Sequence, residues 1–109
     1  MPKILIDFVS ERLRNNIFLL KNGDDSERKL YKYIARAFYD IENDLTCCIK
    51  IPKKLWPNEY KKYKITNLWK YDLPNGWRII FSLRQDDILI LAMILEWLSH
   101  KEYEKRFNY

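Results

Sequence analysis

The chain is poor in the residues that metal, nucleotide and covalent chemistry most often require. Of its 109 residues, only two are glycine, two are cysteine and one is histidine. Two glycines cannot form a glycine-rich phosphate loop or a dinucleotide-binding fingerprint. With a single histidine and no Cys-x-x-Cys pair, a zinc site is not expected. The composition therefore predicts a protein that holds no metal and no cofactor.

The two cysteines are neighbours in the chain, at Cys47 and Cys48. A disulfide between adjacent residues would strain the peptide bond that joins them, so we expect two free thiols. Free thiols are typical of a reducing compartment, and this favours a cytoplasmic protein. The longest unbroken apolar run covers residues 88–95, far short of the roughly 20 residues that span a bilayer. We therefore expect no membrane partner.

Positive charge is concentrated in residues 47–71, called here the lysine-rich segment. The segment holds seven lysines but only one acidic residue, while the whole chain carries a net charge of +5. Lysines attract phosphates, and aromatic rings offer surfaces on which unpaired bases stack. The residues predicted to contact RNA are Lys50, Lys53, Lys54, Lys61, Lys62, Lys64, Trp69 and Tyr71. The alternative interpretation is a solvated loop whose aromatic residues, which include Trp56, Tyr60 and Tyr63, belong to the core.

The apolar pattern predicts one α+β domain over residues 1–109, with elements in the order β-α-α-β-β-β-α. A strand over residues 3–8 should lead to a helix that begins at the N-cap Ser10 and stops at Gly23 in the left-handed conformation. A second helix should begin at the polar residues 24–26 and carry one apolar stripe as far as Leu45. We expect this helical hairpin to pack on one face of a small, mainly antiparallel sheet.

The second half of the chain predicts an antiparallel meander followed by a helix. Strands are expected over residues 65–73, 77–83 and 88–95, and Pro74-Asn75-Gly76 has the composition of a turn between the first two. Ser99 and Glu102 match a capping box, which places the start of a final helix that runs to about Phe107.

Four residues near the end of this layout could carry chemistry. His100 lies in the first turn of the final helix, and Tyr103 follows on the same helical face. Lys70 and Arg78 lie on the two strands that the predicted turn joins, so they should be close across the hairpin. An imidazole can transfer a proton, and cations stabilise phosphate charge. The alternative is a structural His100 and an Arg78 that merely pairs with Asp72 or Glu96.

Two stretches resemble the RelE/ParE toxin superfamily of type II toxin–antitoxin systems, and its archaeal RelE-like branch in particular. Residues 67–81, NLWKYDLPNGWRIIF, are similar to the family's β-hairpin, and residues 96–107, EWLSHKEYEKRF, to its C-terminal signature. Residues 51–54, IPKK, also fit the archaeal branch. With the order of elements, the resemblance covers nearly the whole chain and implies a RelE/ParE-like fold.

The resemblance also implies a function. RelE-like members cut messenger RNA on the ribosome without a metal and are silenced by an antitoxin protein, whereas ParE-like members act on DNA gyrase. Carried over residue by residue, it makes Arg78 and Lys70 phosphate-stabilising residues, His100 a base or acid, and Tyr103 a proton-transfer or stacking residue. Asp72 stands where the family pattern has a second hairpin lysine, and Trp97 falls near the position of a further basic residue.

Two functions therefore remain open at this point. The first is an RNA-binding domain that acts as a metal-independent, ribosome-associated endoribonuclease. The second is a non-catalytic module that docks on an antitoxin, gyrase or ribosome. The resemblance to toxins that hold an antitoxin also implies an exposed apolar patch on the helical hairpin, for which the candidates are Leu13, Ile17, Phe18 and Tyr31.

Overall fold

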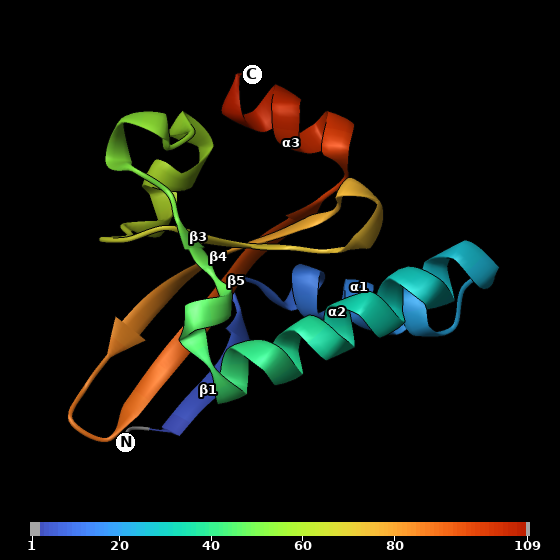
Figure 1. The fold of residues 1–109 in the computed structure, drawn as a ribbon, viewed down its shortest axis with the longest axis horizontal. Helices are drawn as coiled ribbons and strands as arrows, with labels where there is room; N and C mark the ends of the chain where they lie inside the picture. Colours follow the sequence, from blue (N-terminus) through green and yellow to red (C-terminus); the bar gives the residue numbers. More distant parts are fainter. Residues whose placement is uncertain (1–2, 109) are drawn as a thin grey trace.

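The computed structural model describes residues 3–108 and shows an α+β domain with a single sheet. Its strands are β1 (Lys3–Phe8), β2 (Ile49–Lys50), β3 (Trp69–Asp72), β4 (Arg78–Gln85) and β5 (Leu89–Leu98), and its helices are α1 (Glu11–Lys21), α2 (Asp25–Asn43) and α3 (His100–Phe107). Short 3-10 helices cover Leu45–Cys47, Lys53–Leu55, Asn58–Tyr63 and Pro74–Gly76. Figure 1 shows β3 and β4 between α3 on one side and α2 on the other.

The five strands form a mixed sheet in the order β1-β5-β4-β3-β2. The predicted meander of β3, β4 and β5 is confirmed as antiparallel, and β2 adds a further antiparallel pair at the edge. β1 instead runs parallel to β5 at the opposite edge. The sequence pattern did not indicate β2, because two residues are too few to show an alternation of apolar and polar side chains.

The predicted strand over residues 65–73 is too long by four residues at its start, since β3 begins at Trp69. Asn67 explains the difference. Its side-chain amide accepts the Leu83 N–H at 2.7 Å and donates to the Leu83 carbonyl at 2.9 Å. A side chain thus satisfies the β4 backbone groups that a longer β3 would have paired. At the other end of the meander, β5 continues to Leu98, three residues beyond the predicted limit.

The two helices of the hairpin begin at the predicted N-caps, but the first helix ends differently from the prediction. The Ser10 hydroxyl accepts the Leu13 N–H, and Asp24 and Glu27 form a reciprocal capping box at the start of α2. The predicted left-handed stop at Gly23 is wrong, because α1 is capped by Asn22 with a φ of −105°. The Asn22 side chain donates to the Phe18 carbonyl, which satisfies the helix end without a positive φ.

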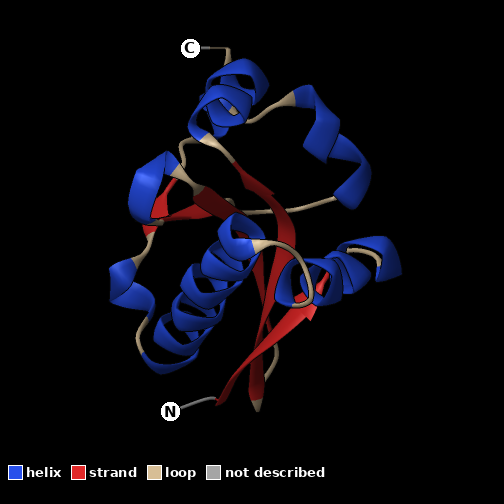
Figure 2. Ribbon diagram, turned by 90° about the vertical axis from the view of Figure 1, so that its right-hand side faces the viewer, coloured by secondary structure: helices blue, strands red, loops and turns tan. Residues whose placement is uncertain are grey.

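The two faces of the sheet are covered by different elements, as Figure 2 also shows. On the hairpin side, α2 packs its buried residues against the strand residues of the first core cluster: Leu30, Ile34, Ala37 and Ile41 against Ile79, Phe81, Ala92 and Ile94. On the α3 side, the lysine-rich segment and α3 cover a second cluster, made of Ile51, Tyr60, Leu68, Ile80, Leu95, Leu98, Tyr103 and Phe107. The predicted packing of the helical hairpin on one sheet face is therefore confirmed.

A bulge in β5 determines which of its side chains lie on the α3 side of the sheet. Ile80 pairs with Glu96 while Phe81 pairs with Ile94, so Leu95 is an extra residue on β5. Such bulges redirect the side chains that follow them. Glu96 contacts Tyr60 and α3, and Leu95 belongs to the core on the same side.

Candidate functional site

The four residues singled out as chemically active lie around one pocket, called here the cationic pocket. Its volume is about 430 Å³. Lys50, Lys70, Arg78, His100, Tyr103 and Glu104 supply its polar lining, and Ile49, Ile51, Pro52 and Leu55 supply its apolar lining. These residues come from β2, the residues after it, β3, β4 and α3, so only the folded chain brings them together.

The β3–β4 hairpin positions the two cations that β3 and β4 contribute. Asp72 pairs with Arg78 across the hairpin, and Lys70 lies two residues before Asp72, hence on the same face. The turn between the strands contains Asn75 and Gly76 with positive φ of 62° and 79°, as its composition predicts. Arg78 donates from its guanidinium to the Gly76 carbonyl, so the turn also holds the arginine in place.

α3 brings His100 against this turn. The predicted capping box is present, since Ser99 accepts the Glu102 N–H and Glu102 accepts the Ser99 N–H. A Cβ atom added to Gly76 would lie 2.9 Å from the His100 Cβ, which is closer than such atoms approach. Because Gly76 lacks that atom, the start of α3 can pack directly on the hairpin turn.

Tyr103 serves as a support for the two cations. Its ring centroid lies 4.7 Å from the Arg78 guanidinium carbon and 5.4 Å from Lys70 Nζ, which are cation–π distances. The residue is only 6% exposed, and its ring also packs against Phe107 at 4.7 Å. A base would have little room to stack on this ring, so the structure favours a positioning role for Tyr103.

Asp72 pairs with both cations. Its Oδ1 lies 3.2 Å from Lys70 Nζ and 3.4 Å from Arg78 Nε. The Arg78 Nε atom is buried and forms no hydrogen bond within residues 3–108. Asp72 thus lies between the two cations and next to this buried donor. The alternative pairing of Arg78 with Asp72 is confirmed, and that with Glu96 is not formed in the described residues.

Glu104 is a site residue that the sequence interpretation missed. Its Oε1 lies 2.5 Å from His100 Nε2, one helical turn away. The signal was available, because residues four apart on a helix are neighbours. The Glu104 carboxylate therefore faces Nε2, which leaves Nδ1 as the ring nitrogen open to a ligand. The His100 side chain is 60% exposed and can reach a ligand in the pocket.

Trp69 and Tyr71 lie away from the cationic pocket. Both pack against the first core cluster, on the hairpin side of the sheet, and each has its polar atom occupied. Trp69 donates to Asn67, and Tyr71 donates to Asp40 at 2.5 Å. Burial and this hydrogen bond raise the pKa of Tyr71 to about 12. We therefore interpret both residues as packing residues rather than stacking surfaces for RNA.

The lysines predicted to bind RNA are exposed, whereas the aromatic residues between them are largely packed. Lys50 belongs to the cationic pocket, and Lys53, Lys54, Lys61, Lys62 and Lys64 lie on the surface of the lysine-rich segment. Lys62 lies over the Tyr63 ring at 5.2 Å. Tyr60 is buried, and Trp56 donates to the Ile51 carbonyl. The alternative interpretation of these aromatic residues as core is therefore correct for Tyr60 and Trp56.

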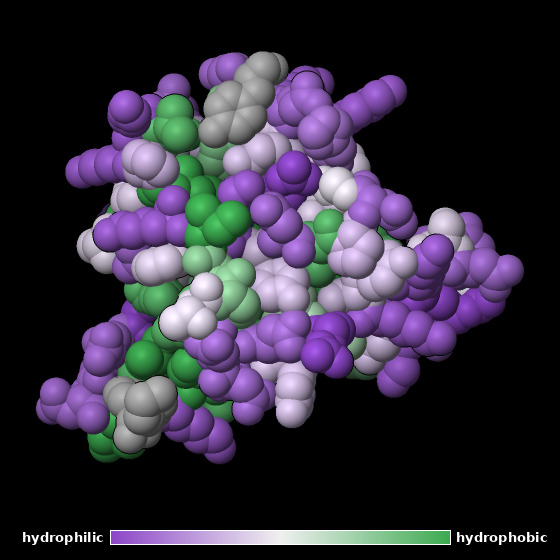
Figure 3. All heavy atoms as spheres, viewed as in Figure 1, coloured by the Kyte–Doolittle hydropathy of each residue, from purple (hydrophilic) through white to green (hydrophobic). Residues whose placement is uncertain are grey.

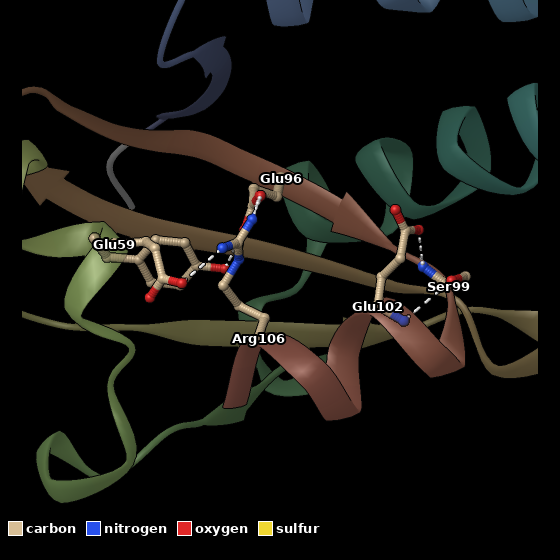
Figure 4. A network of polar contacts seen from close by, with 6 residues as sticks. Glu59, Glu96, Ser99, Glu102 and Arg106 are labelled. Carbon is tan, nitrogen blue, oxygen red and sulfur yellow. Dashed lines mark hydrogen bonds and ion pairs between the residues drawn. The ribbon is translucent and has the colours of Figure 1, made fainter. Parts of the chain in front are cut away.

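An ion-pair network fastens the lysine-rich segment to α3 (Figure 4). Arg106 reaches Glu59 at 2.8 Å and Glu96 at 2.9 Å, and Tyr60 donates to Glu96 at 2.5 Å. The hydrogen bonds with Glu96 raise the pKa of Arg106, and burial raises the pKa of Tyr60. Glu96 is thus engaged by Arg106 and Tyr60, whereas Asp72 pairs with Lys70 and Arg78, and Glu104 with His100.

The predicted patch on the hairpin is only partly exposed. Leu13 and Ile17 pack against the first core cluster, and the Tyr31 ring lies under Lys21. Phe18 is 59% exposed, and its neighbour Leu19, which was not predicted, is 66% exposed. Figure 3 shows further apolar side chains over β1 and the β4–β5 hairpin, at the lower left, where Leu5 and Ile88 are exposed.

Cys47 and Cys48 are free thiols whose sulfur atoms lie 3.4 Å apart, as expected for adjacent cysteines. Within residues 3–108 there is no group of three or more His, Cys, Asp and Glu side chains that could hold a metal ion. In the same range no helix is both long and apolar enough to cross a bilayer. Comparison with family models, curated proteins and solved structures finds no match for this chain.

Proposed function

We propose that this protein binds RNA in the cationic pocket and cleaves it there without a metal ion, in the manner of the RelE-like toxins that its sequence resembles. The observation that carries the proposal is the convergence of Lys70, Arg78 and His100 on one pocket from three separate elements. Two cations and one imidazole are the groups that such a cleavage needs. The proposed setting is the cytoplasm, with ribosome-bound messenger RNA as substrate and an antitoxin protein as partner.

The geometry suggests a role for each group. In the reaction the ribose 2′-oxygen attacks the adjacent phosphorus, the bond from phosphorus to the 5′-oxygen breaks, and a cyclic phosphate and a 5′-hydroxyl form. His100 Nδ1 takes the 2′-hydroxyl proton, with Glu104 holding the opposite nitrogen. The resulting imidazolium can return that proton to the leaving 5′-oxygen. Arg78 and Lys70 stabilise the charge that grows on the phosphate oxygens.

Asp72 limits this activity, because a phosphate must displace it to reach the two cations. Its side chain is 47% exposed, so it can turn away into solvent. The same observation favours a second candidate function. With Asp72 in place, much of the positive charge in the pocket is neutralised. A pocket of this kind suits a non-catalytic module that docks on an antitoxin, gyrase or ribosome.

A cleavage assay distinguishes the two functions. Purified protein is incubated with translating ribosomes in the presence of a metal chelator, and messenger RNA ends are mapped. Arg78→Ala should lower the rate about a hundredfold or more, by analogy with the loss of one oxyanion donor. His100→Ala should cost about a hundredfold or more as well, because it removes the proton carrier.

The matched control is Arg84→Ala, which removes an exposed arginine from the same strand outside the pocket and should leave the rate unchanged. Asp72→Asn should raise the rate several-fold, because it removes the competing charge while keeping the shape. If neither wild type nor Asp72→Asn cuts RNA while both still bind ribosomes, the catalytic proposal is wrong and the binding module is correct. Cleavage by Asp72→Asn alone would identify the natural protein as a disarmed relative.

A further inference from the structure

A second, smaller pocket opens within the lysine-rich segment itself and shares no residue with the cationic pocket. Its volume is about 250 Å³, below the roughly 300–1,000 Å³ typical of drug-sized ligands. Its apolar lining consists of the partly exposed Trp56 and Ile65 above the buried Pro57 and Tyr60, and Lys53, Lys61 and Lys64 form its charged lining. The 3-10 turn Lys53–Leu55 contributes to both pockets, with Leu55 in the cationic pocket and Lys53 in the second one.

The charge at this second pocket is not compensated. All three lysines are exposed, and within residues 3–108 none of them forms an ion pair. No acidic residue lines the pocket, and the one acid of the segment, Glu59, is paired with Arg106. An apolar pocket lined by three free ammonium groups fits a ligand that carries a small apolar body between negative charges. One nucleotide of a single strand has this form.

The pocket has few groups with which to identify a base. The Trp56 indole N–H donates to the Ile51 carbonyl at 2.9 Å, and the Tyr60 hydroxyl donates to Glu96 at 2.5 Å. Pro57 and Ile65 offer no side-chain donor or acceptor. Base identity is read through hydrogen bonds to base edges, so a pocket whose aromatic polar groups are already occupied does not discriminate strongly.

We propose that this pocket receives one unpaired base of a single-stranded RNA, while Lys53, Lys61 and Lys64 hold the neighbouring phosphates without selecting the base. The inference rests on the proposed RNA-binding function and adds a second contact point for the substrate. The bound strand would pass from this pocket over the turn at residues 53–55 towards Arg78 and Lys70. The acidic-peptide alternative is less suited, because carboxylates on a flexible chain do not need a pocket with apolar walls.

The test uses the full chain, a five-nucleotide oligouridine and an oligomer of equal length and charge that lacks bases. Binding is followed by NMR at low salt, through the Trp56 indole N–H and the Ile65 backbone N–H. Oligouridine should shift both signals and bind roughly tenfold or more tightly than the abasic oligomer. Stacking of one base on an aromatic side chain increases the affinity by about that factor. Oligoadenosine should bind within about fivefold of oligouridine.

Charge removal provides a matched comparison. The triple variant Lys53→Ala, Lys61→Ala, Lys64→Ala should weaken oligouridine binding tenfold or more and lower the salt slope by roughly 2, at about 0.7 per phosphate contact. The control triple variant Lys21→Ala, Lys29→Ala, Lys32→Ala removes the same charge from the helical hairpin and should cost less than about threefold. Repeating the titration in Arg78→Ala separates this inference from the proposed function, because the second pocket should keep its signals when catalysis is lost.

Three results would overturn the inference. Equal affinity for oligouridine and the abasic oligomer would show that the lysines act as a diffuse charge. Tight binding by oligouridine with no change at Trp56 or Ile65 would place the base elsewhere. A hexaglutamate peptide that binds as tightly as oligouridine and shifts the same signals would make the pocket an acidic-peptide site.

Discussion

The two faces of the sheet show two ways of covering a β-sheet. On the hairpin side, α2 lays one regular apolar stripe on the strands, and its polar residues point to solvent. On the α3 side, the cover is one short helix and a segment of 3-10 turns, held by buried aromatic residues and the Arg106 network. Both pockets discussed above open on this second side. The irregular lysine-rich segment leaves pockets between the residues that pack on the sheet, and lysines line those pockets.

Truncating buried side chains on the two sides of the sheet should therefore have different consequences. Hydrophobic burial stabilises the hairpin side, so its residues should affect the free energy of unfolding and leave RNA contacts alone. Charged networks stabilise part of the α3 side, so its residues should affect both stability and the pockets. The four predictions below test this difference.

The largest effect is expected for Ile41→Ala on the hairpin side. Ile41 is fully buried, and truncating it removes apolar burial and leaves a cavity. The free energy of unfolding should fall by about 2–5 kcal/mol in denaturant titrations. The control is Ile88→Ala, the same substitution at a residue 80% exposed, which should change stability by less than about 0.5 kcal/mol. Equal losses at the two positions would contradict the packing described for α2.

Arg106→Ala should be next in size. It leaves Glu96, whose side chain is 23% exposed, without its cationic partner, at a cost of about 1–3 kcal/mol of unfolding free energy. Arg36→Ala on α2 is the matched control, because it breaks a helical ion pair whose arginine is 75% exposed and should cost well under 1 kcal/mol. A comparable loss in both variants would mean that the network does not anchor the α3 side.

Gly76→Ala should have a smaller effect on stability and a specific effect on the pocket. A φ of 79° costs a residue with a Cβ about 1–2 kcal/mol, and the new atom would contact His100. We expect the His100 imidazole NMR signals to shift as α3 moves. Asn75→Gly in the same turn is the control, since it relieves a positive φ and should leave those signals in place. An unchanged His100 spectrum in Gly76→Ala would show that the turn does not position α3.

The smallest effect concerns alkaline pH. Tyr71 has a pKa of about 12 in the folded chain against 10 for the free side chain, and the pKa of Tyr60 is raised as well. The folded state therefore binds these protons more tightly, so their contribution to stability is complete below pH 10 and declines as the pH rises towards 12. Tyr71→Phe on the hairpin side should flatten this decline, and Tyr60→Phe should flatten it further. Denaturant titrations between pH 9 and 12 measure both slopes, and identical slopes in wild type and Tyr60→Phe would contradict the burial of its hydroxyl.

Much of the fold was predictable because its signals are local. The caps at Ser10, Asp24 and Ser99, and the turn at Pro74–Gly76, are each encoded within a few residues. One error arose where a distant contact replaced a local one, because the Asn67 side chain pairs with the Leu83 backbone, 16 residues away. The other error was local, since Asn22, the neighbour of the predicted Gly23, caps α1.

The site was predictable in part. The hairpin register brings Lys70 close to Arg78, and helical spacing groups His100 with Tyr103. Alternation along a strand places Trp69 and Tyr71 on the face opposite Lys70, which already favours a packing role for both. The concentration of lysines in that segment led to the prediction that Trp69 and Tyr71 contact RNA together with the lysines. The two-residue period of a strand is the more direct signal, because it places the two aromatic residues and Lys70 on opposite faces.

By itself, the sequence determined the helices, the meander, the turn and the excess of lysine in one segment, because each depends on residues close together in the chain. Only the tertiary structure decided which lysines remain unpaired, which aromatic residues are buried, and that Asp72 lies between the two cations of the cationic pocket. Those outcomes depend on contacts such as Arg106 with Glu59, 47 residues apart. Contacts between residues so far apart in the sequence are set by the packing of whole elements, which no local pattern encodes.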